Sequence, residues 1–280
     1  MSGTAASVEE WSGKDRADEN FPVGSALIRP DLRRHVHAFY AFARNADDIA
    51  DSATLPASDK IARLDAMEAV LLGRADEAAS PSAAQLRKSL GETGTTAQHS
   101  RELLVAFRRD ATKLRYASWD ELYDYCRYSA MPVGRHVLDL HREDAATHPP
   151  SDALCTALQV LNHLQDCAKD LRALDRCYLP EDLLEESGAG IADVARREAS
   201  PGLRRVFDAL LGRVEALNAL AIGLPRRTRS RRLRLETAVI VGLSRRLAAR
   251  LRREDPIAGR VKLRRADIAA SVLGALRFLP

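Results

Sequence analysis

Apolar residues recur along most of the chain at the spacing of one face of an α-helix. Between residues 30 and 50, for example, Leu32, Val36, Phe39 and Ala43 follow one another at intervals of three or four. No segment alternates apolar and polar residues with the period of two that a half-buried strand requires. The pattern therefore predicts an all-α protein, which the abundance of Leu, Ala, Arg and Glu also favours.

Local signals predict where these helices begin and end. Ser58 and Ser151 stand where N-caps are expected, and Pro149 with Pro150 should interrupt the chain before Ser151. Pro132 should kink the helix that contains it, because it lacks an N–H donor. We expect the principal helices over residues 30–50, 58–72, 98–112, 118–141, 151–171, 202–222, 230–253 and 265–278, with shorter ones after residues 81 and 180.

No internal repeat or shift in composition marks a domain boundary. Residues 1–19 are polar and lack the apolar core of a signal peptide, so we expect a flexible leader there and a single helical domain over residues 20–280. No run approaches the roughly 18 apolar residues of a membrane-spanning helix. The final segment, 268–280, is apolar enough to lie on a membrane or to pack on the protein.

The charge is mild but unevenly placed. The formal net charge is +4, yet residues 225–234 include six arginines, which form either a solvated helix start or a contact with an anionic membrane or substrate. No pair among Cys126, Cys155, Cys167 and Cys177 has the spacing of zinc ligands. We expect buried free thiols and a cytoplasmic protein, with contact to the inner membrane face as an open alternative.

An acidic stripe ends the helix expected over residues 30–50. Tyr40, Arg44, Asp47 and Asp51 follow at i, i+4, i+7 and i+11 and share one face, with Asp48 beside them. Carboxylates at the C-terminal end oppose the helix dipole, and like charges one turn apart repel each other. A solvated helix end with chance acids is the plain alternative, but this placement favours a bound cation.

A second acidic stripe lies on the helix expected over residues 151–171. Asn162, Asp166 and Asp170 share a face, and Gln165 lies beside it. Taken alone, this pattern is also typical of a surface helix. Two such helices can share metal ions across a cavity, and hard oxygen ligands suit magnesium that holds a diphosphate.

These stripes carry a resemblance to the squalene/phytoene synthase family, over nearly all of residues 20–265. The motifs are Tyr-Ala-Phe-Ala-Arg and Asp-Asp-Ile-Ala-Asp within 40–51, a tyrosine-rich tract over 125–134, and 162–170 followed by Arg-Cys-Tyr-Leu-Pro at 176–180. Head-to-tail prenyl synthases and terpene cyclases share the first acidic motif. The complete set of motifs in this order distinguishes the squalene/phytoene synthase family from both of them. The resemblance implies an isoprenoid-synthase-type helical bundle around a central cavity, acting on prenyl diphosphates by head-to-head chemistry.

Two departures narrow the choice within the family. Gln165 stands where an arginine is usual, and Lys169 replaces a usual acidic residue. The tracts 19–24, 128–135 and 162–167 resemble the HpnC-type enzymes of bacterial hopanoid biosynthesis. That resemblance implies conversion of presqualene diphosphate and water to hydroxysqualene and diphosphate, with Mg²⁺ and without a nicotinamide cofactor. It also implies a functional partnership with a presqualene diphosphate synthase and a squalene-forming reductase.

The resemblance and the spacing together suggest a role for each site residue. Tyrosine rings would shield a carbocation, neutral amides would position one water, and the arginines would contact phosphate. Phe39, Phe42 and the histidines are interpreted as packing or surface residues. The expected catalytic residues are Asp47, Asp51, Asp166, Asp170, Tyr40 and Gln165, of which the four aspartates hold the metal; the expected substrate-binding residues are Arg44, Asp48, Tyr125, Asn162, Arg176 and Tyr178.

Two alternatives stay open at this point. The protein could instead have another activity of the same family, as a presqualene diphosphate, squalene or phytoene synthase. Such an enzyme condenses two prenyl diphosphates head-to-head. A basic helical scaffold would instead bind a membrane or nucleic acid through residues 226–234. Single-strand binders interleave aromatic side chains with their basic ones, and this run has none, so we expect no nucleic-acid partner.

Overall fold

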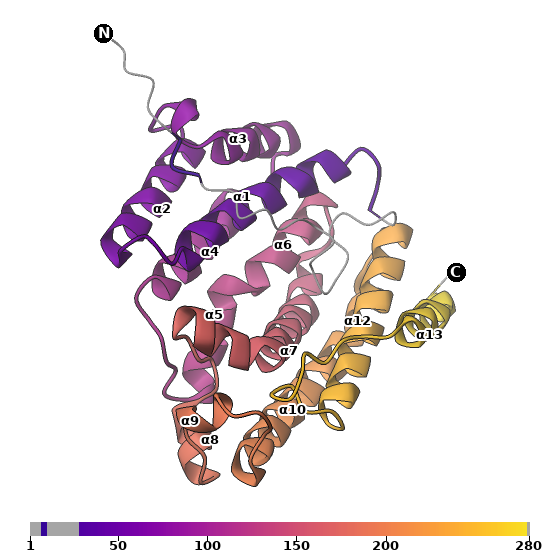
Figure 1. Ribbon diagram of the computed structural model, residues 1–280. Helices are drawn as coiled ribbons and strands as arrows, with labels where there is room; N and C mark the ends of the chain where they lie inside the picture. The colour runs from indigo at the N-terminus through magenta and orange to yellow at the C-terminus, as the bar shows by residue number, and fades with distance from the viewer. Residues whose placement is uncertain (1–6, 10–27, 279–280) are drawn as a thin grey trace. The chain divides into compact units, whose positions relative to one another are not determined.

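The computed structural model describes residues 7–9 and 28–278, and every regular element within them is a helix (Figure 1). This confirms the predicted all-α class. The longer helices are α1 Arg33–Asp51, α2 Ala57–Leu71, α3 Pro81–Thr93, α4 Gln98–Asp110, α5 Trp119–Ser129, α6 Met131–Leu140, α7 His148–Leu174, α10 Pro201–Ala221, α12 Arg231–Leu251 and α13 Arg265–Ala275. The shorter ones are α8 Glu181–Glu186, α9 Ile191–Val194, α11 Gly223–Arg227 and the 3-10 turns η2 Glu77–Ala79, η3 Ala145–Thr147 and η4 Leu276–Phe278.

Contacts between Cα atoms divide the chain into two compact units. Unit 1 comprises Met1–Thr112 with Arg135–Arg142, and unit 2 comprises Lys113–Gly134 with Glu143–Pro280. The single domain over residues 20–280 stays a prediction. The flexible leader over residues 1–19 also stays one, because most of it lies outside the described residues.

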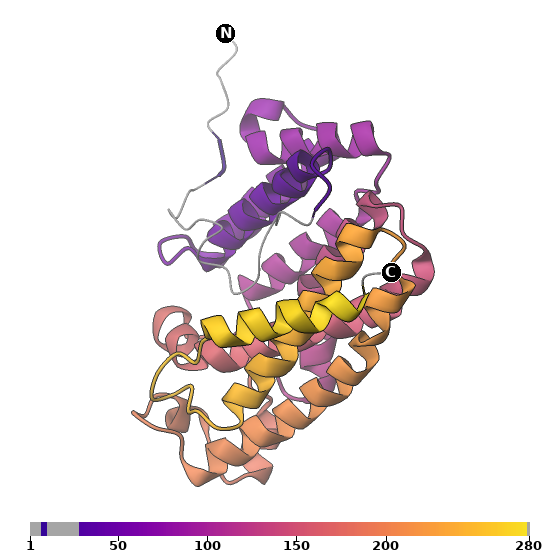
Figure 2. The same cartoon turned by 90° about the vertical axis from the view of Figure 1, so that its right-hand side faces the viewer.

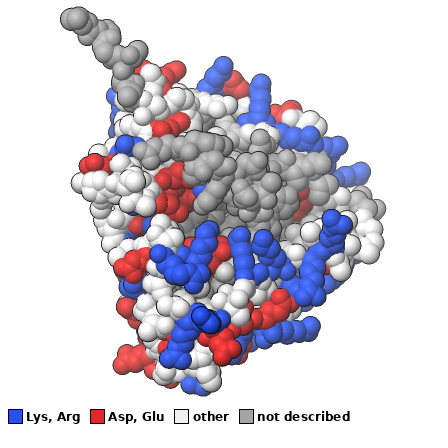
Figure 3. Space-filling view, viewed as in Figure 1, with Lys and Arg blue, Asp and Glu red and all other residues white. Residues whose placement is uncertain are grey.

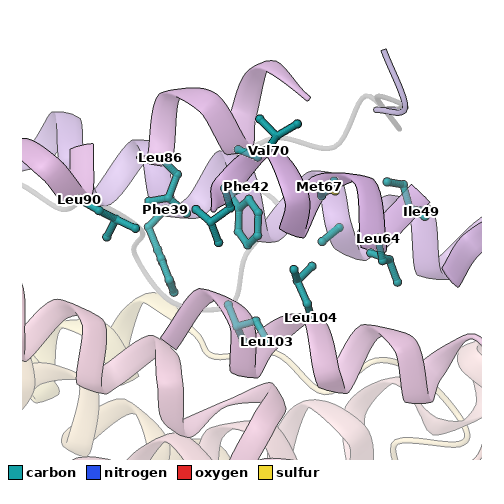
Figure 4. Packing of buried hydrophobic residues seen from close by; sticks show 13 residues of the cluster. Phe39, Phe42, Ile49, Leu64, Met67, Val70, Leu86, Leu90, Leu103 and Leu104 are labelled. Carbon is teal, nitrogen blue, oxygen red and sulfur yellow. The ribbon is translucent and has the colours of Figure 1, made fainter. Parts of the chain in front are cut away.

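The core of unit 1 forms where α1 packs against α2, α3 and α4. Phe39 and Phe42 of α1 are 4% and 0% exposed, and they lie in one apolar cluster with Leu64, Leu86 and Leu104 (Figure 4). This burial confirms the interpretation of both phenylalanines as packing residues. Each contributes on the order of 1.5–3 kcal/mol by leaving water. The same packing fixes the position of α1, which carries the first acidic stripe.

Residues 7–9 attach to unit 1. The N–H of Val8 donates to the C=O of Ala79 at 2.9 Å. The carboxylate of Glu9 accepts hydrogen bonds from Ser80 Oγ at 2.6 Å and from the N–H of Ser82 at 2.8 Å. Glu9 thus lies at the first turn of α3, where N–H groups lack helical acceptors and a negative charge is favourable.

Unit 2 is built around α7, which packs against α10 and α12, while α13 packs across α12 (Figure 2). Leu161 of α7, Phe207 and Leu211 of α10 and Leu247 of α12 are all at most 1% exposed. The apolar residues that α7 buries leave its acidic residues on another part of the helix surface. Packing in unit 2 therefore fixes the helix that carries the second acidic stripe.

Two predicted helix starts were wrong. Helix α7 begins at His148, with Pro149 and Pro150 in its first turn, so Ser151 is not its N-cap. Proline is tolerated there because the first N–H groups of a helix have no helical acceptor. Similarly, Ser58 lies inside α2, whose N-cap position is held by Pro56.

The single kinked helix predicted over residues 118–141 was wrong, because the chain breaks at Ala130, two residues before Pro132. Ala130, at φ −127° and ψ −49°, separates α5 from α6, and Pro132 is the second residue of α6. The lost donor therefore falls in a first turn.

Part of the basic run holds the junction between α11 and α12. The N–H of Arg229 donates to Glu143 at 2.7 Å, and Arg234 Nε donates to the C=O of Thr228 at 3.0 Å.

The four cysteines are free and three are buried, as predicted. Across the part of the chain that the structure describes, no helix is long and apolar enough to cross a membrane.

Candidate active site

The first acidic stripe lies at the end of α1 and contains its own counter-ion. Arg44 Nη1 lies 3.1 Å from Asp47 Oδ2, and Arg44 Nη2 donates to Asp48 Oδ1 at 2.6 Å. The side chain of Asp48 is 4% exposed, whereas that of Asp47 is 36% exposed. Asp47 is therefore the more accessible carboxylate of the two, and Asp48 is bound internally by Arg44.

Negative charge is concentrated around Asp47. The pKa of Asp47 is raised to about 8, first because protein atoms around the carboxylate displace part of its water and then because Asp51 carries a like charge, while Arg44 opposes the shift. Asp110 of α4, which sequence reasoning missed, and Asp48 also raise the pKa. Several carboxylates thus act on one another around Asp47. Hard carboxylate oxygens in such a cluster suit a divalent cation such as Mg²⁺.

The second acidic stripe lies on α7, and its Asp166 has a basic partner. Arg260 Nε lies 3.1 Å from Asp166 Oδ1, and Arg260 Nη2 donates to Asp166 Oδ2 at 3.1 Å. This is the two-pronged geometry in which a guanidinium binds a carboxylate most firmly. Because α7 is continuous through Asp170, the predicted shared face of Asn162, Asp166 and Asp170 is confirmed.

Gln165 has a structural contact. Its side chain is buried, and its Nε2 donates to the C=O of Val261 at 2.5 Å. Val261 follows Arg260 in the segment between α12 and α13, so this hydrogen bond holds that segment against α7. The expected role of Gln165 in positioning water stays a prediction beside this contact.

A buried aromatic cluster in unit 2 brings together three of the expected residues. The hydroxyls of Tyr125 and Tyr178 lie 3.5 Å apart, and Arg176 Nη1 donates to Tyr178 Oη at 3.2 Å. The ring of His163 stacks on Tyr178 with centroids 3.7 Å apart, and Tyr116 stacks on the same tyrosine at 5.4 Å. All five side chains belong to residues that are at most 7% exposed.

The environment of His163 keeps its ring neutral. Burial, together with the nearby Arg176 guanidinium, lowers the pKa of His163 to about 3. A neutral ring can stack on Tyr178 without a desolvated charge. This agrees with the interpretation of His163 as a packing residue.

The structure thus groups the expected residues within each unit. Arg44, Asp47 and Asp48 meet on α1, and half-buried Tyr40 and Asp51 lie on the same helix. Among residues 7–9 and 28–278, no three His, Cys, Asp or Glu side chains could hold a metal ion by themselves. A metal site shared by α1 and α7 therefore stays a prediction.

Sequence reasoning missed residues that have no spacing signal. Arg260 is 94 positions from Asp166, and Asp110 lies on another helix than Asp47. Tyr116 lies in the loop before α5, where helical periodicity says nothing about its partners. Only packing could identify these three residues.

Comparison with known proteins agrees with this arrangement. Hydroxysqualene synthase of Rhodopseudomonas palustris is 45% identical over 273 residues, which cover 98% of this chain and 92% of the relative. Hydroxysqualene synthase of Zymomonas mobilis is 45% identical over 258 residues, covering 91% and 86%. The crystal structure of squalene synthase HpnC from Alicyclobacillus acidocaldarius has a TM-score of 0.74 at 34% identity, covering 85% of this chain and 90% of that one.

The family model described as squalene/phytoene synthase matches residues 14–267. This range includes both acidic stripes, the aromatic cluster and Arg260. The ordered motifs, the helical fold and these matches all indicate the same relationship. The chain belongs to the squalene/phytoene synthase family.

Proposed function

We propose that this protein is a hydroxysqualene synthase, which converts presqualene diphosphate and water to hydroxysqualene and diphosphate. The observation that carries the proposal is the near full-length similarity to two hydroxysqualene synthases. The acidic stripes on α1 and α7 support it, because a reaction that expels diphosphate needs cations to neutralise the leaving anion, and carboxylates are suited to hold them. The reaction breaks one C–O bond and gives its electron pair to diphosphate, which leaves a cyclopropylcarbinyl cation. This cation rearranges with cleavage of a C–C bond of its ring, a water oxygen adds to the cationic carbon, and one proton is released.

We propose that Mg²⁺ is held by Asp47 and Asp51 from α1 and by Asp166 and Asp170 from α7. The residues fit this ion: all donors are hard oxygens, and the crowding that raises the pKa of Asp47 would be relieved by a cation. When bound, Mg²⁺ acts as a Lewis acid that stabilises diphosphate as a leaving group. We expect Arg44 and Arg260, which already pair with Asp47 and Asp166, to contribute positive charge beside the departing anion.

The remaining side chains would protect and direct the carbocation. Tyr40, half-buried on α1, would present its π face, worth about 0.5–2 kcal/mol. Tyr125 is packed against Tyr116, Tyr178 and His163, so its ring contributes mainly by holding the wall of unit 2 rigid. Arg176 and Tyr178 hold each other through a hydrogen bond in the same wall. Asn162 and Gln165 are the neutral amides proposed to position the attacking water.

The chemistry of substrate and product indicates where the protein works. Both carry long hydrocarbon chains, so we propose a cytoplasmic protein that works at the inner face of a membrane. An enzyme that joins two farnesyl diphosphates must supply the substrate. A reductase that replaces the hydroxyl by hydride must follow if squalene is the end product.

Product analysis tests the proposed function. The purified chain is incubated with Mg²⁺ and either presqualene diphosphate or farnesyl diphosphate, with and without NADPH. We expect hydroxysqualene from presqualene diphosphate alone, and no effect of NADPH. Formation of presqualene diphosphate, squalene or phytoene from simple prenyl diphosphates would replace this proposal by another activity of the family.

A further inference from the structure

Helix α13 and η4 carry an apolar stripe on their outer surface. Ile268, Val272, Leu273 and Leu276 follow at helical spacing, and they are 46%, 46%, 67% and 49% exposed. The side of α13 that faces the rest of unit 2 holds Ser271 and Ala275, each 3% exposed. Four large apolar side chains in one exposed stripe exceed the scattered single residues that are normal on a protein surface.

The stripe is bordered by basic side chains that lack acidic partners. Lys262, Arg265, Arg245 and Arg277 are exposed, and among the described residues none of them forms an ion pair. The acid of α13, Asp267, is already neutralised by Arg250 Nη1 at 3.3 Å. Lys and Arg side chains gather over this part of unit 2 in Figure 3. The surface is therefore both apolar and positive.

A pocket of about 360 Å³ opens beside the stripe, between α12 and α13. Its wall includes the side chains of Arg245, Arg246 and Arg277 together with the hydroxyl residue Ser271. Ala238 and Val241 of α12 are among its apolar lining residues. A pocket with guanidinium groups and apolar walls suits a ligand with an anionic head and a hydrocarbon body.

We propose that α13 and η4 form the surface by which this protein binds an anionic phospholipid bilayer. The apolar stripe enters the headgroup region, and the arginines of the pocket bind lipid phosphate. Charge complementarity favours a bilayer over a second copy of the chain. A symmetric pairing of two such faces would bring Arg245, Arg265 and Arg277 of one copy close to the same positive residues of the other.

This surface differs from a membrane anchor and does not depend on the enzymatic proposal. A helix that exposes apolar side chains beside basic ones binds a bilayer surface through buried apolar area and through attraction between the basic side chains and anionic lipids. Such binding is reversible and weakens as salt increases. The inference rests on α12, α13 and η4 alone, so loss of vesicle binding and loss of catalysis are separate observations.

Vesicle flotation of the full chain tests the surface. One set of vesicles contains phosphatidylcholine, and the other mixes it with phosphatidylglycerol. We expect the protein to float with the mixed vesicles, and to remain unbound with phosphatidylcholine alone or in high salt. The double variant Arg245→Gln and Arg277→Gln should bind roughly 30-fold more weakly, because each arginine contributes about 1 kcal/mol of attraction to the anionic lipid surface. Leu273→Gln should bind roughly tenfold more weakly without a change of charge.

Matched variants distinguish an effect of this particular surface on vesicle binding from an effect of the overall charge or hydrophobicity of the protein. Arg74→Gln with Arg197→Gln removes the same charge from exposed positions outside α12 and α13, and Leu114→Gln replaces an exposed leucine before α5. Both controls should bind as the unmodified chain does. Equal weakening by the controls, or unchanged binding by the α13 variants, would overturn the proposal. So would a dimer in sedimentation that Leu273→Gln dissociates, if the unmodified chain does not bind mixed vesicles.

Discussion

At the scale of single residues, the chain separates charge that it binds internally from charge that it leaves accessible. Arg44 binds buried Asp48 and half-exposed Asp47, and Arg260 binds Asp166 by two contacts. Helical spacing predicted which acids share a face, because that depends on neighbours three or four positions apart. It could not predict Arg260, since that contact joins segments distant in sequence. The same limit applies to the hydrogen bond between Gln165 and Val261.

Replacing Asp47 should separate activity from stability. In Asp47→Asn we expect activity with presqualene diphosphate to fall on the order of a hundredfold or more, because a proposed metal ligand is lost. In EDTA the same variant should be more stable by roughly 0.5–1 kcal/mol after allowance for solvent screening, since one of several crowded carboxylates is removed. Steady-state kinetics and urea unfolding measure the two effects. Asp59→Asn, at an exposed position in the first turn of α2, should leave activity unchanged and should not raise stability. Full activity of Asp47→Asn would contradict the proposed metal site.

Replacing Gln165 tests whether its amide does more than hold Val261. Gln165→Leu leaves the Val261 carbonyl without this donor, so unfolding free energy should fall by about 1–3 kcal/mol. If the amide also positions water, the fraction of hydroxysqualene among the products should fall as well. Products are analysed at a temperature where circular dichroism shows the variant to be folded. An unchanged product distribution would limit Gln165 to its structural role.

At the scale of elements, the hydrophobic pattern predicted most helices, and local chemistry decided their ends. Pro149 and Pro150 were expected to interrupt the chain, but α7 begins at His148 and holds both prolines in its first turn, where proline is tolerated. A kink was expected at Pro132, but the chain breaks at Ala130 and Pro132 lies in the first turn of α6. Close approaches between elements had no such signal, and they are most evident at glycines.

Two glycine substitutions should have opposite effects. A Cβ on Gly202, in the first turn of α10, would lie 2.7 Å from the backbone C=O of Ser187, so Gly202→Ala should destabilise the protein by about 1–3 kcal/mol. Gly91 lies inside α3 with no atom within 4 Å of such a Cβ, and Gly91→Ala should stabilise by about 0.4–1 kcal/mol. Urea unfolding measures both. Equal effects of the two substitutions would show that helix propensity alone, and not the approach of α10 to Ser187, governs Gly202.

At the scale of the whole molecule, the sequence predicted the all-α class and the family, and both are confirmed. That α1 and α7 share metal ions stays a prediction, because the two helices belong to different units and spacing within a helix carries no information about how units meet. Each unit does contain a buried histidine ring that its burial keeps neutral. His136 stacks on Phe39 with centroids 3.9 Å apart in unit 1, and His163 stacks on Tyr178 in unit 2.

These two histidines should make the fold sensitive to acid. Burial lowers the pKa of each to about 3, and His99 beside His136 and Arg176 beside His163 act in the same direction. Asp139 opposes the shift of His136. An unfolded chain takes up protons on both rings near pH 6.5, whereas the folded chain does so only near pH 3. The unfolded state therefore binds more protons between these values, and stability should fall as the pH is lowered through this window.

The variant His163→Phe isolates the contribution of His163 to the loss of stability at low pH. Phenylalanine keeps a ring against Tyr178 but cannot bind a proton, so stability near pH 7.5 should change little. Between pH 6.5 and pH 4 the variant should lose roughly 1–3 kcal/mol less than the unmodified chain. Urea unfolding across this range measures the difference, and His148→Phe, at the partly buried start of α7, is the control. If His163→Phe and the unmodified chain lose stability in parallel, the proton taken up on unfolding does not come from this ring, and His163 must already be accessible to acid in the folded protein.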